Sequence, residues 1–182
     1  MTVAPSDYNE HDQRIWDEEL ADFLPRRIFD AHIHLLDRRR LSNVPGAFLN
    51  WSDTDLTSLQ TWAQRLYPER ETHFLALGTP SPGIDVPAHT RWTIQQIQQD
   101  PQSRLQRLVT PSCRLDDIAR DLEQPGVVGL KPYRLFATSG DAAGCRIHEF
   151  LPHEQLELAD DRRLWITLHL SRYDGCADGW NL

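Results

Sequence analysis

The sequence predicts an α/β fold built around a parallel sheet. Five short apolar stretches alternate with longer amphipathic ones, no two apolar stretches are joined by a hairpin signal, and the apolar stretches are apolar on both faces. Strands buried on both faces and separated by helices are typical of parallel sheets. In such folds the chemistry lies at the C-terminal ends of the strands. Candidate functional residues are therefore expected there.

The individual elements follow from residue spacing and from turn residues. We expect strands at 27–34, 73–77, 105–109, 126–131 and 164–170. We expect helices at 8–24, 54–67, 88–100, 116–123 and 152–161, with a long loop at 133–150. Thr54 or Asp55 is expected to cap the second helix. Residues 1–26 form a helical extension, expected to pack as a lid or plug on one domain that spans residues 27–182.

Composition excludes several classes of protein. The 182 residues carry a net charge of −8, lysine is nearly absent, and no basic patch interleaves with aromatic residues, so nucleic acid is not an expected partner. No run of 18 apolar residues is present, so no membrane span is expected. Cys113, Cys145 and Cys176 are far apart and odd in number. Together with a polar, acidic N-terminus, they indicate reduced thiols in a cytoplasmic protein.

The first strand ends in a His-x-His pattern. Residues two apart on a strand point to the same side, so His32 and His34 leave the same face and could share one metal ion. Asp30 is expected on that face too, one step deeper in the strand. Taken alone, the pattern is equally compatible with a strand that happens to end in two histidines.

Two further strands present basic or ligating side chains at the same end. Alternation places Lys131 on one face of its strand together with Val127 and Gly129. It places His169 on a face with Trp165 and Thr167, while the opposite face of that strand is wholly apolar. Three strands thus each bring such a side chain to one edge of the sheet, which predicts a common site.

These residues lie in three motifs that resemble the amidohydrolase superfamily, in its amidohydrolase-2 branch of metal-dependent hydrolases and decarboxylases. The motifs run over 29–35, 128–133 and 166–172, and the resemblance covers roughly residues 8–176. It implies a distorted (β/α)₈ barrel that holds zinc or another divalent ion. It also implies that His32, His34 and His169 are metal ligands.

The resemblance assigns further roles to neighbouring side chains. Lys131 matches a fourth-strand lysine that is carbamylated in binuclear members and unmodified in most of this branch, so Lys131 and His169 are the catalytic candidates. Tyr133, Arg134 and Arg172 follow the fourth and fifth strands, where an anionic substrate would bind, and arginine suits a carboxylate because its fork contacts both oxygens. These three could equally be ordinary surface-loop residues.

Such a barrel has eight strands and typically needs about 250 residues, whereas five strands are visible here. A sixth-strand histidine and an eighth-strand aspartate of the family are missing. We therefore expect a C-terminally truncated, partial (β/α)₈ barrel of about five β/α units. The expected function is metal-activated hydrolysis of a small carboxylate-bearing substrate, with little activity in the truncated chain. The alternatives are a metal-dependent non-oxidative decarboxylase and a non-catalytic fragment that self-associates or binds a partner.

Overall fold

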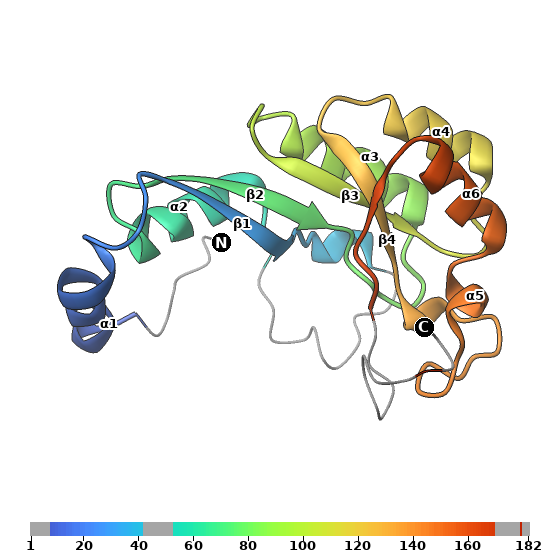
Figure 1. The fold of residues 1–182 in the computed structure, drawn as a ribbon, viewed down its shortest axis with the longest axis horizontal. Coiled ribbons are helices and arrows are strands. Elements are labelled where there is room, and N and C mark those ends of the chain that lie inside the picture. The colour runs from blue at the N-terminus through green and yellow to red at the C-terminus, as the bar shows by residue number, and fades with distance from the viewer. Residues whose placement is uncertain (1–7, 42–52, 170–178, 180–182) are drawn as a thin grey trace.

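The fold is an α/β half-barrel. The computed structural model describes residues 8–41, 53–169 and 179. Its sheet has five parallel strands in the order β1-β2-β3-β4-β5. The strands are β1 Arg27–His34, β2 Glu71–Leu77, β3 Arg104–Val109, β4 Val127–Pro132 and β5 Trp165–Ile166. Because each strand pairs with the next along the chain, every crossover winds the same way around the sheet. This is the strand order of a (β/α) barrel, and it differs from that of a doubly wound sheet (Figure 1).

The helices form close to the expected positions. They are α1 Glu10–Ile15, α2 Leu56–Leu66, α3 Val86–Ile97, α4 Leu115–Leu122, α5 Ile147–Phe150 and α6 His153–Asp161, with short helices η1 Trp16–Leu20, η2 Arg38–Arg40 and η4 Arg134–Phe136. Asp55 caps α2, since its side chain accepts a hydrogen bond from the Ser58 amide. The expected loop 133–150 contains the two short helices η4 and α5.

Strand β5 is shorter than expected, because only Trp165 and Ile166 pair with β4 where the sequence predicts a strand over 164–170. Two physical reasons account for this. In the described part of the chain β5 is an edge strand, held from one side only. In addition, β4 ends at Pro132, which has no amide hydrogen to continue the ladder.

The two faces of the sheet have different partners. On the outer face, Phe74 and Ala76 pack with residues of α2 and α3, and Leu130 packs with residues of α5 and α6. Gly129 and Lys131 alternate with Leu130 and so lie on the inner face. Gly129 also allows β5 to approach, because a Cβ there would lie 2.0 Å from the Trp165 carbonyl oxygen. The alternation predicted for β4 is therefore confirmed for Gly129 and Lys131 but wrong for Val127, which packs in the outer core because β4 has one extra residue between Val127 and Gly129.

The free edges of the sheet expose large apolar side chains. Trp165 on β5 is 72% exposed and Phe29 on β1 is 49% exposed. Exposed strand edges are sites of pairing with other chains. Self-association through these edges stays a prediction, and light scattering would test it.

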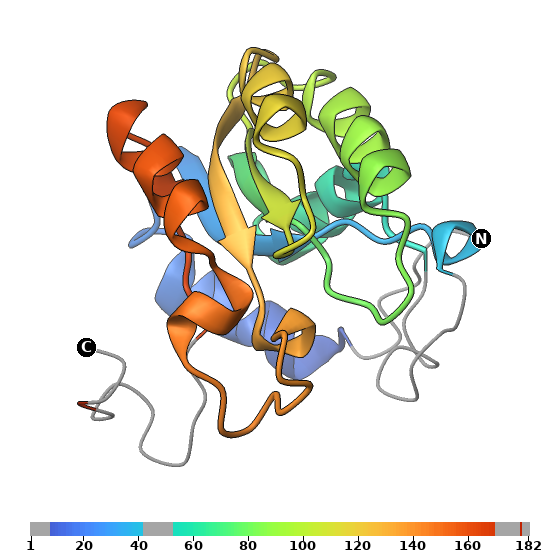
Figure 2. The ribbon, with the colours of Figure 1, turned by 90° about the vertical axis from the view of Figure 1, so that its right-hand side faces the viewer.

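The N-terminal helical segment lies at the N-terminal ends of the strands. The Trp16 ring lies 6.3 Å from that of Tyr67, the last residue of the α2 turn, and the Arg70 guanidinium stacks over Trp16 just before β2 begins. This segment is therefore at the opposite end of β1 from His34, and Figure 1 shows α1 beside the start of that strand. Figure 2 shows α3, α4 and α6 around the outer side of the sheet. Within the described residues, no helix is long and apolar enough to cross a membrane.

Candidate functional site

His32 and His34 are neighbours at the C-terminal end of β1, with ring centroids 5.4 Å apart. The strand has an irregularity there. The pairing with β2 runs from Asp30 opposite Phe74 to Ile33 opposite Ala76, so β1 contains one extra residue. Such a bulge resets the alternation of side chains.

The expectation that Asp30 shares the histidine face is therefore wrong. Asp30 pairs with Phe74, which belongs to the outer core, and it lines a cavity with Leu59 and Trp62 of α2. Its carboxylate accepts a hydrogen bond from the His32 amide at 3.0 Å. Asp30 thus stabilises the bulge from the helix side, and His34 lines the same cavity.

The His34 ring is held in one orientation. Its Nδ1 lies 3.1 Å from the Leu77 carbonyl oxygen, which can only accept a hydrogen bond, so Nδ1 carries the proton and Nε2 keeps its lone pair. Burial lowers the pKa of His34 to about 4, opposed by the Leu77 bond and assisted by charge on His32, Lys131 and His169. His34 is thus neutral at pH 7, in the tautomer that a metal ligand or an acceptor for water requires.

Lys131 is the single lysine of the chain and is only 2% exposed. Its Nζ lies 4.7 Å from the centroid of the Tyr133 ring. Burial lowers the pKa of Lys131 to about 8, and none of the described carboxylates forms an ion pair with it. A buried cation without a counter-ion is costly. An anion bound beside Lys131 would offset this cost.

Tyr133 lies near both His34 and His169. Its ring is a neighbour of both the His34 ring and the His169 ring, with centroid distances of 6.5 Å and 5.4 Å. Its hydroxyl is buried and has no hydrogen-bond partner among the described residues. Burial also raises the pKa of Tyr133, so the hydroxyl keeps its proton and is available as a donor.

The remaining predicted residues lie around this cluster or outside the described chain. Arg134 is buried in η4 and donates to the Ala143 carbonyl at 2.5 Å, which fastens the following loop. His169 is exposed, and its pKa is lowered by partial burial and by charge on Lys131, Arg134 and His32. The structure thus brings His32, His34, Lys131, Tyr133, Arg134 and His169 to one end of the sheet. Arg172 lies outside the described residues.

The described residues do not make up a complete metal site. Among them, no group of three histidine, cysteine or acidic side chains is placed to hold one ion. The Tyr133 ring neighbours both His34 and His169, with centroids 6.5 Å and 5.4 Å away. A catalytic zinc site commonly has three protein ligands, and here only His32 and His34 are adjacent.

His89 is a residue that the sequence analysis missed. Its Nε2 accepts a hydrogen bond from the Thr79 amide at 3.1 Å, and the Thr79 hydroxyl donates to the Leu35 carbonyl at 2.7 Å. This chain of bonds ties α3 to the loops that follow β2 and β1, next to His34. The four-residue spacing of His89, Thr93 and Ile97 could have placed His89 on the buried side of α3, but nothing in the sequence indicates its partner.

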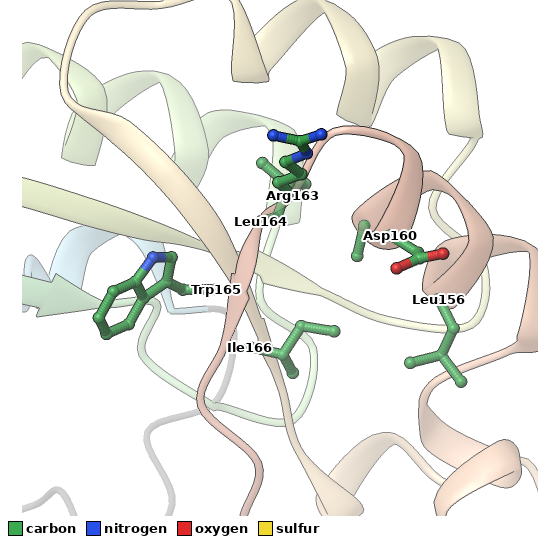
Figure 3. A pocket seen from close by; sticks show the side chains of 7 residues that line it. Leu156, Asp160, Arg163, Leu164, Trp165 and Ile166 are labelled. Carbon is green, nitrogen blue, oxygen red and sulfur yellow. The ribbon is translucent and has the colours of Figure 1, made fainter.

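The cavity beside β5, about 610 Å³, is a separate feature (Figure 3). It is lined by Leu156 and Asp160 of α6 and by residues 163–166, and Trp165 points to the other side of the strand. It contains none of the residues of the histidine cluster. We therefore do not assign the chemistry to it.

Comparison with solved structures gives a match for the architecture. The chain is similar to a probable 2-pyrone-4,6-dicarboxylic acid hydrolase from Acinetobacter baumannii, solved with citric acid bound. The TM-score is 0.51 and the identity is 13% over 76% of this chain and 47% of that one. The likeness establishes the fold. The chain spans about half the length of that hydrolase.

The sequence comparisons add no family. No family model matches the chain, and no curated protein matches it.

Proposed function

We propose that the cluster at the C-terminal end of the half-barrel serves the hydrolysis of a small carboxylate-bearing substrate, as in the amidohydrolase-2 family. One observation carries the proposal: among the described residues the buried Lys131 has no counter-ion, and its Nζ lies over the Tyr133 ring, whose hydroxyl is unpartnered, at the same end of the sheet as the His32–His34 pair. In barrels of this class, reactions take place at this end of the strands.

Lys131, Tyr133 and Arg134 form the anion-binding part of the site in this proposal. A substrate carboxylate would supply the charge that Lys131 lacks and the acceptor that Tyr133 lacks. The dicarboxylic acid in the name of the structural neighbour fits the same chemistry. The chain spans about half the length of that neighbour. Hydrolysis by the whole protein is therefore a proposal and not a property of the neighbour carried over.

A divalent metal, with zinc as the first candidate, is the second part of the proposal. His32 and His34 would hold it, and His169 would complete the set only if Tyr133 or His169 moved. When bound, such an ion supplies an activated water molecule. Because the described residues do not form a complete site, we assign no reaction step to it.

The test separates the two parts. Zinc per chain is measured after loading and dialysis for the wild type, for His32→Ala/His34→Ala, and for His11→Ala/His153→Ala, which removes two exposed histidines as a control. We expect about one zinc per chain in the wild type and the control, and none in the His32/His34 variant. Wild-type protein that retains no zinc would refute the metal part.

Hydrolysis is measured separately with 2-pyrone-4,6-dicarboxylate as the probe, by loss of the pyrone absorbance. We expect binding of the diacid and only slow turnover in the wild type, and a further loss of turnover of about a hundredfold or more in Lys131→Met. Turnover that Lys131→Met leaves unchanged would contradict the assigned role of Lys131. A wild-type protein that neither binds nor hydrolyses the diacid would overturn the proposed function.

A further inference from the structure

A second cavity lies on the outer side of the sheet, between α3 and α4. Its volume is about 650 Å³, within the usual range of small-molecule sites. It lies over the end of β3 and is walled by the first turns of α3 and by one side of α4. Its polar lining consists of Asp85, Arg91, Arg107, Thr110, Ser112, Cys113, Arg114, Asp117, Arg120 and Asp121. We refer to it as the arginine cavity.

The arginine cavity is basic, although the chain as a whole carries a charge of −8. Four arginines face three aspartates in its lining. Each aspartate already has a partner. Asp121 pairs with Arg107 at 2.7 Å, Asp117 pairs with Arg120 at 2.5 Å, and Asp85 accepts from the Ala88 amide at the start of α3.

The excess positive charge belongs to Arg91 and Arg114. Among the described residues, no carboxylate forms an ion pair with Arg91. Arg114 has a contact of 3.6 Å with Asp116, but both side chains are highly exposed and Asp116 does not line the cavity. Exposed pairs of this kind contribute little, so Arg114 remains available to a ligand.

The floor of the cavity is rigid. Arg107 is 3% exposed, and its guanidinium is held by Asp121, by the Leu108 carbonyl at 2.9 Å and by the Cys113 sulfur at 3.7 Å. The Thr110 and Ser112 hydroxyls lie 3.0 Å apart beside it. A fixed guanidinium, two hydroxyls and two uncompensated arginines are the donors that an oxyanion requires.

We propose that the arginine cavity is a binding site for a small ligand that carries phosphate or carboxylate groups, with Arg91 and Arg114 as its recognition residues. The site is separate from the histidine cluster, none of whose residues lines it. The inference is therefore independent of the proposed hydrolase function.

The test uses inorganic phosphate and citrate as probes, titrated by calorimetry at constant ionic strength. It is run in a Lys131→Met background, so that an anion bound at the histidine cluster does not contribute. Arg91→Gln/Arg114→Gln is compared with Arg14→Gln, which removes an exposed arginine of α1 that is remote in sequence from the cavity. Circular dichroism verifies that all variants fold.

We expect saturable binding of at least one probe, about tenfold weaker in Arg91→Gln/Arg114→Gln and unchanged in Arg14→Gln. The tighter of the two probes then identifies phosphate or carboxylate as the recognised group. Absence of saturable binding of both probes would overturn the proposal. Equal affinity in the two arginine variants would overturn it as well.

Discussion

The two ends of the sheet both contain histidines, but they are built differently. At the N-terminal end, His73 lies between two carboxylates, 2.8 Å from Asp100 and 3.1 Å from Glu71. Asp100 also accepts from the Ser103 hydroxyl at 2.5 Å and from the Gln102 amide at 3.0 Å. At the C-terminal end, His34, Lys131 and Tyr133 have no carboxylate partner, and the Tyr133 hydroxyl has no partner at all among the described residues.

The difference indicates what each end is for. A buried polar network in which every group is bonded stabilises a fold and leaves nothing for a ligand. A buried cation and a buried hydroxyl without partners cost stability, and such costs are concentrated at functional sites. The His73 network is therefore assigned to stability and the Lys131 cluster to binding, and three experiments can break or sharpen this contrast.

The largest effect is expected from Lys131→Met. Removal of an uncompensated buried cation should raise the free energy of unfolding at pH 7 by about 2 to 3 kcal/mol, since a pKa lowered to about 8 reflects a cost of that order. Urea denaturation measures this, with Arg14→Met as the control for loss of a surface charge. A destabilised Lys131→Met protein would mean that Lys131 has a structural role, and the contrast between the two ends would fail.

At the other end, Asp100→Ala should destabilise the fold by about 2 kcal/mol, because Ser103, His73 and the Gln102 amide all lose an acceptor. Urea denaturation is again the measurement. Glu157→Ala, which removes an exposed partner of His153, should change stability by less than about 0.5 kcal/mol. Citrate binding at the Lys131 cluster, measured in an Arg91→Gln/Arg114→Gln background to exclude the arginine cavity, should be the same with and without Asp100→Ala, and a weakened affinity would argue against independent ends.

The smallest effect is a slope in the pH dependence of stability. Folding lowers the pKa of Lys131 from 10.5 to about 8, so between these values the unfolded chain binds a proton that the folded chain does not. Wild-type stability should therefore rise with pH above about 8 relative to Lys131→Met, by up to about 1.4 kcal/mol per pH unit. Thermal unfolding of both proteins between about pH 7 and 9.5 measures this difference in stability. The pH range ends below the usual pKa of tyrosine, so tyrosine titration does not contribute. If stability changes with pH in the same way in both proteins, the pKa of Lys131 is not lowered on folding.

The C-terminal side of this contrast was predictable from the sequence, whereas the His73 network was not. Apolar alternation in β4 and the residues after it placed Gly129 and Lys131 on one face, and the strand ends gathered His34, Lys131 and His169 at one edge. Asp30 was placed wrongly because a bulge changes the face without changing the apolar pattern. The extent of β5 was overestimated because pairing depends on a neighbouring strand, which local spacing cannot reveal.

The contacts between residues that are distant in the sequence could not be predicted from it. Nothing in the order of residues indicates that the Thr79 amide donates to His89, or that the Tyr133 ring neighbours both His34 and His169. The arginine cavity was not predicted from the sequence for the same reason. Its four arginines come from α3, β3, the residue before α4 and α4 itself, and they form no cluster along the chain.

The scarcity of lysine has a consequence for chemical modification. Apart from an α-amino group at residue 1, the 182 residues contain a single amine, that of Lys131 in β4. Acetylation of this chain on a side-chain amine would therefore neutralise the cation of the binding cluster itself, with no surface lysine to absorb the modification. Because Lys131 is the single lysine, a label directed at side-chain amines would report on this position alone. The rate at which the label attaches would measure how often the Lys131 amine becomes exposed to solvent.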